Sequence, residues 1–154
     1  MKGNIFDIFI ADVAGEKMQS ISTATLIAGK GIEGDRYFSG KGTFSEKLKG
    51  KPSVELSLIE KEEIDRFNNT QKQYNKYGDF RRNIITEGIR LNGYLGKEFK
   101  VGNVILKGIR LCEPCSHLAE TVNSLVLPHI IGFCGLRAQI ISGGLISQGG
   151  IIDG

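Results

Sequence analysis

Two cysteines in the motif Cys112-Glu-Pro-Cys115 are the residues of this chain best suited to chemistry. Pro114 fixes its own backbone and favours an extended Glu113, so the chain is expected to turn between the two sulfurs. Ser116 can then cap a short helix that places Cys115 just before its N-terminus. The partial positive charge of a helix start, with arginines nearby in the sequence, favours a thiolate. A thiolate at such a strand-to-helix corner can act as a nucleophile or as a metal ligand.

Four interpretations of this motif are open. Cys112 and Cys115 can begin a structural zinc site completed by Cys134 and a histidine, His117 or His129, although the second half of a zinc ribbon is absent. They can form a thioredoxin-like redox pair, but the βαβ alternation typical of that motif does not surround them. They can pack as small hydrophobic groups, a description that suits Cys134 among its apolar neighbours. In the fourth, Cys115 alone is a functional thiolate that faces a ligand held by other loops.

The first of those loops is the glycine-rich stretch 29–45, whose backbone N–H groups can nest an anion. It carries Asp35 and Arg36, with Lys41, Thr43 and Ser45 as weaker candidates for ligand contacts. The stretch lacks the Ser or Thr that must follow the Gly-Lys pair of a Walker A loop, and an aspartate stands where the first glycine belongs. A nucleoside triphosphatase is therefore excluded.

The second loop is Arg81-Arg82-Asn83, immediately ahead of an apolar strand. Arginine can bind a phosphate or carboxylate through two parallel hydrogen bonds, and asparagine offers both a donor and an acceptor. The sequence therefore predicts a compact set of anion-binding donors here.

The elements that must position these residues are mainly strands. Twenty-one glycines and only three prolines in 154 residues suggest tight turns between short strands, and hence an all-β barrel with small helices in one domain, residues 1–154. Strands are predicted over 5–13, 20–27, 54–59 and 104–111, with 135–141 and 145–152 as a closing glycine-turned pair. Residues 60–68 are predicted to form a short amphipathic helix with Ile59, Ile64 and Phe67 inward and its acidic residues in solvent. Leu91, Leu95, Phe99 and Val101 are predicted core residues.

Charge and cysteine content narrow the function classes. A net charge of +3 allows an anionic small ligand but does not indicate nucleic acid, which requires a denser basic stripe. No apolar run approaches the ~18 residues of a membrane span, and the first residues lack the apolar core of a signal peptide. An odd count of three cysteines favours reduced thiols. We therefore expect a cytoplasmic protein that binds neither nucleic acid nor membrane.

Four motifs in order carry a family resemblance. Gly31-Ile-Glu-Gly-Asp-Arg-Tyr37, Arg81-Arg-Asn-Ile-Ile85, Leu95-Gly-Lys-Glu-Phe-Lys-Val-Gly102 and Leu111-Cys-Glu-Pro-Cys-Ser-His-Leu118 together resemble a stand-alone MOSC domain, named for the C-terminal domain of molybdenum cofactor sulfurase. The glycine-rich end of the chain resembles that family's terminal strands. The resemblance runs from about Gly29 to the end. It implies a mostly antiparallel, β-barrel-like fold with a few short helices.

The resemblance also implies a function. Members of the family bind, or are thought to bind, the molybdopterin form of molybdenum cofactor; some reduce N-hydroxylated compounds, and others are proposed to carry sulfur as a cysteine persulfide. The family's key cysteine falls on Cys115, as molybdenum ligand or sulfur carrier, and its asparagine falls on Asn83. Arg81 and Arg82, alongside the Asp35-Arg36 loop, would contact the pterin phosphate. A cysteine desulfurase or an external electron-donor protein would be the partner, and a non-catalytic sulfur-shuttling or cofactor-binding module is the alternative function.

Overall fold

The computed structural model describes residues 2–42, 45–47, 49–51, 55–72, 74–112 and 134–154. Its strands are β1 (Lys2–Ile10), β2 (Gln19–Ile21), β3 (Thr23–Ile27), β4 (Gly31–Ile32), β5 (Leu56–Glu60), β6 (Ile84–Glu87), β7 (Glu98–Val101), β8 (Val104–Leu111), β9 (Leu136–Ser142), β10 (Gly144–Ser147) and β11 (Ile151–Asp153). The helical elements are α1 (Lys61–Gln71) and two short 3₁₀ turns, η2 (Tyr77–Phe80) and η3 (Leu91–Tyr94).

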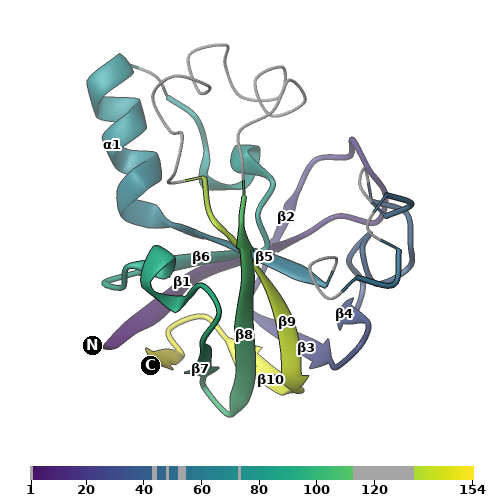
Figure 1. Cartoon of the computed structure of the whole chain (residues 1–154). Coiled ribbons are helices and arrows are strands. Elements are labelled where there is room, and N and C mark those ends of the chain that lie inside the picture. Colours follow the sequence, from purple (N-terminus) through teal and green to yellow (C-terminus); the bar gives the residue numbers. More distant parts are fainter. Residues whose placement is uncertain (1, 43–44, 48, 52–54, 73, 113–133) are drawn as a thin grey trace.

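The main sheet closes on itself (Figure 1). Its strands run in the order β11-β7-β8-β9-β5-β6-β1-β2, and β11 also pairs with β1, so that seven strands form a barrel with β2 added at the edge of β1. The closing pair places Lys2 opposite Asp153. The neighbouring strands β5 and β6 are parallel and are joined through α1, while the other ladders of this sheet are antiparallel. The predicted, mostly antiparallel barrel with few helices is confirmed.

A second sheet has three strands in the order β10-β3-β4. Two of its strands differ from the sequence prediction. The predicted strand 20–27 is divided at Ser22, so that β2 pairs with β1 and β3 joins the second sheet. The predicted pairing of 135–141 with 145–152 is wrong, because β9 lies between β8 and β5 while β10 pairs with β3. Gly143 permits this change of sheet, since a Cβ at that position would overlap the carbonyl oxygen of Leu26.

Two apolar cores hold these elements together. Alternate residues of each strand face opposite sides, so Leu58 and Ile84 belong to one core while the next residues, Ile59 and Ile85, belong to the other. The second core receives Ile64 and Phe67 from α1, together with Cys112 and Cys134, which confirms the predicted inward face of the helix. Each large apolar side chain buried in this way contributes about 1.5–3 kcal/mol.

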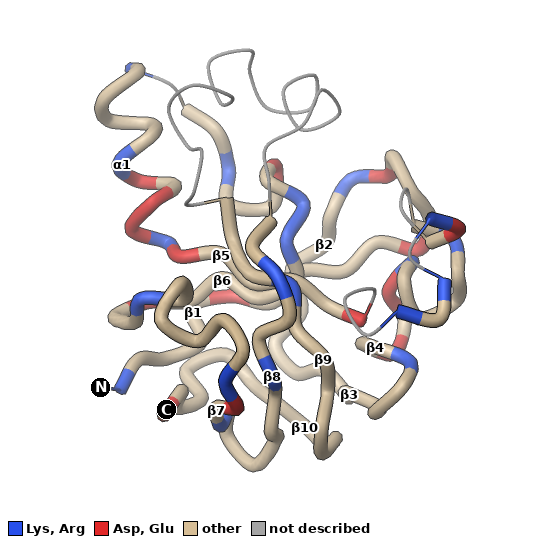
Figure 2. Tube along the Cα trace, in the orientation of Figure 1, with Lys and Arg blue, Asp and Glu red and all other residues tan. Residues whose placement is uncertain are grey.

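The acidic residues at the end of β5 and in α1 (Figure 2) were predicted to form a solvated face, and for two of them this prediction is wrong. Glu60 and Glu63 are buried. Arg66 donates to Glu63 Oε1 at 2.7 Å, and Arg90, from the turn after β6, lies 3.3 Å from Glu60 Oε1. Glu60 Oε2 also accepts the backbone N–H of Leu91 at 3.1 Å. Carboxylates can be buried here because distant donors pair with them.

The prediction is also wrong for one core residue, Leu95. Leu91, Phe99 and Val101 are buried as expected, but Leu95 is 45% exposed. Leu95 follows the last residue of η3 and forms only an isolated bridge to Gly108, so its side chain lies outside the alternation of the neighbouring strands.

Candidate functional site

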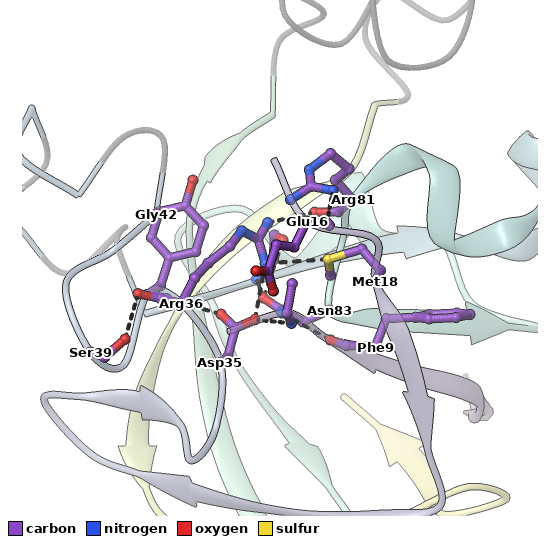
Figure 3. Close-up of polar contacts among 12 residues, drawn as sticks. Phe9, Glu16, Met18, Asp35, Arg36, Ser39, Gly42, Arg81 and Asn83 are labelled. Carbon is purple, nitrogen blue, oxygen red and sulfur yellow. Dashed lines mark hydrogen bonds and ion pairs between the residues drawn. The ribbon is translucent and has the colours of Figure 1, made fainter. Parts of the chain in front are cut away.

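The carboxylate of Asp35 organises the glycine-rich loop that follows β4 (Figure 3). Its Oδ1 accepts the backbone N–H of Ala11 at 3.2 Å and Nη1 of Arg36 at 2.9 Å, while Oδ2 accepts the backbone N–H of Tyr37 at 3.2 Å. The Asp35 and Arg36 side chains are both buried. The ion pair thus forms inside the protein, where charged groups are stable only when they are paired and hydrogen-bonded.

Arg36 joins this loop to two other segments. Nη1 also lies 3.4 Å from the sulfur of Met18, and Nη2 donates to the carbonyl oxygen of Arg81 at 3.2 Å. Its Nε is buried without a hydrogen-bond partner among the described residues. The structure therefore brings together Asp35-Arg36 and the Arg81 turn, two predicted regions that lie 45 residues apart.

The side chain of Arg81 and its backbone have different partners. It follows η2 with a φ of 60°, and its Nη1 donates to the carbonyl oxygen of Glu16 at 2.6 Å. Its Nη2 is buried and has no hydrogen-bond partner among the described residues. Burial, and then the nearby charge of Arg36, lower the pKa of Arg81, while Tyr37 and Asp35 act in the opposite sense. Asp35 forms its ion pair with Arg36, so the guanidinium of Arg81 adds positive charge that this pair does not balance.

Asn83 bridges two strands through its side chain. Nδ2 donates to the carbonyl oxygen of Phe9 at 3.1 Å, and Oδ1 accepts the backbone N–H of Ser57 at 3.1 Å. The residue is buried, with 1% of its surface exposed. Both ends of the amide are used within the fold, and the predicted contact with a pterin edge stays a prediction.

Arg82 points away from this cluster and towards the ends of β8 and β9. Its Nε donates to the carbonyl oxygen of Cys134 at 3.0 Å, and Nη2 lies 3.3 Å from the Cys134 sulfur. Next to it, the backbone N–H of Cys112 donates to the carbonyl oxygen of Gly135 at 2.8 Å. Cys112 and Cys134 are free, buried thiols, as expected for Cys134. Among the predicted anion-binding residues, Arg82 is therefore the one that contacts Cys134, the residue that follows 113–133.

The remaining predicted residues are distributed around the loop. Lys41 is exposed. Its backbone N–H donates to the carbonyl oxygen of Arg36, and its carbonyl oxygen accepts the backbone N–H of Ala14. Ser45 Oγ accepts the backbone N–H of Gly42 at 2.7 Å. Thr43 and Cys115 lie outside the described residues, as do the two histidines, so their predicted roles stay predictions.

Sequence reasoning missed Arg137. This arginine of β9 is buried, and its guanidinium carbon lies 5.3 Å from the centre of the Tyr37 ring, which Arg36 approaches at 4.8 Å. A cation over an aromatic face is attracted by the ring's negative potential. The available signal was that Arg137 is the one charged residue of β9.

A pocket of about 510 Å³ lies on the Met18 side of the cluster. Phe9, Met18 and Tyr77 give it an apolar lining, and Lys17 and Arg81 contribute positive charge. This volume falls within the range of small-molecule sites. None of the pocket residues except Arg81 was predicted from sequence, because they come from three separate segments.

Within the described parts of the chain, no group of three or more His, Cys, Asp or Glu side chains is placed to hold a metal ion. Those same parts contain no helix with the length and apolar character needed to cross a membrane.

The MOSC domain model matches residues 45–153, which is more than half of the chain. The chain belongs to the MOSC family. Comparison with curated protein sequences finds no match for this MOSC protein. This is the family that the four motifs predicted.

Solved structures share the fold of this MOSC protein at low sequence identity. The YUAD protein from Bacillus subtilis is similar with a TM-score of 0.82 at 16% identity, over 99% of this chain and 94% of that chain. YiiM from Geobacillus stearothermophilus has a TM-score of 0.72 at 13% identity, over 98% and 74%. YiiM from Escherichia coli has a TM-score of 0.66 at 18% identity, over 99% and 69%. At these identities the likeness concerns the fold alone.

Proposed function

We propose that this MOSC protein binds the molybdopterin form of molybdenum cofactor and uses Cys115 as molybdenum ligand or as persulfide sulfur carrier. The observation that carries the proposal is the contact between the glycine-rich loop and the Arg81 turn, made by Arg36 Nη2 and the Arg81 carbonyl oxygen at 3.2 Å. It places the guanidinium of Arg36 against the backbone of the Arg81 turn, so that two distant segments that carry arginines meet. Family membership supports the choice of cofactor.

The residues present fit a phosphate-bearing cofactor. Arg36 keeps a buried Nε–H without a partner among the described residues. A guanidinium donor suits a phosphate oxygen, and the positive charge of Arg36 and Arg81, of which Asp35 balances only one, favours an anion. In the proposal Arg36, Arg81 and Asn83 hold the phosphate and the polar edge of the pterin, with Asp35 orienting Arg36, while Arg82 would act at the ends of β8 and β9, beside Cys134.

The border of residues 113–133 supports the role given to Cys115. Cys112 and Cys134 are buried in the second core, and Arg82 stands beside Cys134. In the proposal Arg82 also favours the thiolate of Cys115, which is the form that ligates metals and attacks sulfur donors. A cytoplasmic, reducing setting would keep such a thiol free.

A bound molybdenum centre would supply two-electron chemistry, which suits the reduction of N-hydroxylated compounds. This chain would contribute the thiolate, the phosphate-binding donors and the buried second core that excludes water behind them. Electrons would come from an external donor protein. In the sulfur-carrier version a cysteine desulfurase would load Cys115, and the protein would turn over no substrate of its own.

The first test measures cofactor binding. Protein purified from a cofactor-producing host is assayed for molybdenum and for fluorescent pterin, and we expect both in near-stoichiometric amounts. Stoichiometric zinc without pterin would instead indicate a structural zinc module and contradict the proposal.

The second test uses a matched pair of variants. Cys115→Ser should remove reductase activity on an N-hydroxylated base, or the persulfide formed with a cysteine desulfurase, whereas Cys134→Ser should have a much milder effect. The reductase assay with an electron donor and the persulfide assay separate the two versions. Equal effects of the two substitutions in both assays would show that the role is wrongly assigned to Cys115.

A further inference from the structure

We propose that the pocket between residues 15–20 and residues 76–81 binds a small molecule that combines a carboxylate with a flat apolar body. The pocket holds about 510 Å³ and is lined by Phe9, Met18 and Tyr77 together with Lys17, Lys76 and Arg81. It is separate from the ends of β8 and β9, where Arg82 contacts Cys134. The pocket shares Arg81 with the proposed cofactor site, so its test uses cofactor-free protein.

The apolar side of the pocket is built from three segments. Phe9 lies at the end of β1, Met18 precedes β2, and Tyr77 begins η2. Gly78 brings the turn close to them, since a Cβ at that position would lie 3.0 Å from the Phe9 ring. Aromatic and thioether groups of this kind favour a flat apolar ligand, because both make extensive contacts with the face or edge of a ring.

The charged side of the pocket provides the recognition of an anion. Arg81 is only 9% exposed, and its Nη1 is held at the pocket wall by the carbonyl oxygen of Glu16. Its Nη2 is buried and has no partner among the described residues. A buried N–H without an acceptor is costly, and an added carboxylate would supply the missing acceptor.

The balance of charge points to the same ligand class. Asp35 is already engaged by Arg36 and by the backbone N–H groups of Ala11 and Tyr37. Asp79, the carboxylate that lines the pocket, accepts the backbone N–H of Lys76 at 2.9 Å. Lys17 and Lys76 add exposed positive charge at the rim. The pocket thus carries three cations and one carboxylate, an excess that an anionic ligand would neutralise.

Calorimetric titration of the cofactor-free protein with benzoate, benzamide and inorganic phosphate tests the proposal. We expect benzoate to bind with one-to-one stoichiometry, and benzamide, which has the same ring without the charge, to bind about tenfold more weakly or worse. Phosphate, which has the charge without the ring, should also bind more weakly than benzoate. Benzoate that fails to bind, or that binds no better than benzamide, overturns the proposal. Phosphate that binds as tightly as benzoate contradicts the proposed contribution of the flat apolar body.

Variants locate the binding site. Arg81→Met should weaken benzoate binding by about tenfold or more, because it removes the charge-assisted hydrogen bonds. Lys17→Gln changes an exposed side chain at the rim and should weaken binding severalfold while the protein stays folded. Lys97→Gln, a similarly exposed lysine before β7, is the matched control and should bind benzoate as the unchanged protein does. If Arg81→Met does not fold, Lys17→Gln decides: equal benzoate affinity in Lys17→Gln and Lys97→Gln contradicts the assignment.

Discussion

Arg36 donates from Nη1 to the carboxylate of its sequence neighbour Asp35 at 2.9 Å, and both side chains are buried. The pair is the meeting point of three segments, because Arg36 also contacts Met18 and the Arg81 carbonyl oxygen. Any ligand that uses the guanidinium of Arg36 therefore binds a group whose orientation is fixed by the fold. Such a fixed donor needs little reorganisation on binding.

Asp35→Asn should destabilise the fold. The substitution removes the charge that pairs with Arg36 and turns an amide N–H towards one of the groups that donate to Asp35, so we expect a loss of about 3–5 kcal/mol in the free energy of unfolding. Urea denaturation measures it. Asp12→Asn, at an exposed position, is the control and should change stability by less than about 0.5 kcal/mol. Similar midpoints for the two variants would mean that the buried pair is energetically minor.

Asn83→Ala should also lower stability, whatever role Asn83 has in ligand binding. It removes the acceptor for Ser57 N–H and the donor to the Phe9 carbonyl oxygen, each of which is left buried at a cost of about 1–3 kcal/mol. The same denaturation assay applies, with Asn103→Ala in the exposed turn after β7 as control. An Asn83→Ala protein as stable as that control would assign the residue to ligand binding alone.

Glu60 gives a pH dependence with a defined sign. Burial is the main cause that raises its pKa above the ordinary value of 4.5, so the folded state binds a proton more readily than the unfolded chain. Its contribution to stability is therefore fully present below about pH 4.5 and is lost as the pH rises through the folded-state pKa. Glu60→Gln replaces the carboxyl group with an amide that does not ionise, so the variant does not lose this stability. The free energy of unfolding of the variant minus that of the unchanged protein should therefore increase from pH 4.5 to pH 7.

Chemical denaturation at several pH values measures this difference. Glu98→Gln changes an exposed carboxyl group of β7 and should follow the unchanged protein at every pH. A Glu60→Gln curve that stays parallel to the unchanged protein would contradict the assigned cause.

Gly135→Ala should disrupt the barrel where β9 begins. Gly135 has a φ of 116°, and a Cβ there would overlap the carbonyl oxygen of Leu58. Backbone must move to accept it, so we expect a loss above about 3 kcal/mol, against about 1 kcal/mol for Gly96→Ala, whose φ is 76° and whose surroundings are open. Thermal unfolding of both variants provides the comparison. Equal melting temperatures would show that β9 can shift without cost.

The sequence was most informative where one periodic pattern decides the structure. The bounds of β8 were predicted correctly as Val104–Leu111, since apolar residues predominate in this segment and the Gly102-Asn103 turn precedes it. The inward face of α1 followed from its spacing for the same reason. Patterns of this kind are local, and the fold uses them directly.

Predictions failed where a distant segment changes the environment of a residue. The sequence near Glu60 does not indicate its ion pair with Arg90, and the sequence near Ser57 does not indicate its hydrogen bond with Asn83. The candidate site was predicted as two loops, and Arg36 does join them, but the opposite directions of Arg81 and Arg82 depend on backbone geometry that a list of residue types does not contain. Arg137 was missed because its partner ring arrives from another loop.

The pairing of β1 with β11 makes the two ends of the described chain neighbours (Figure 1). Lys2 faces Asp153 across this ladder, so a short flexible peptide could join the first and last strands without altering any other pairing. The chain could then be opened at the exposed Gly102-Asn103 turn between β7 and β8. This barrel is thus a natural candidate for circular permutation, with new ends at a tight turn that leaves the order of strands around the ring unchanged.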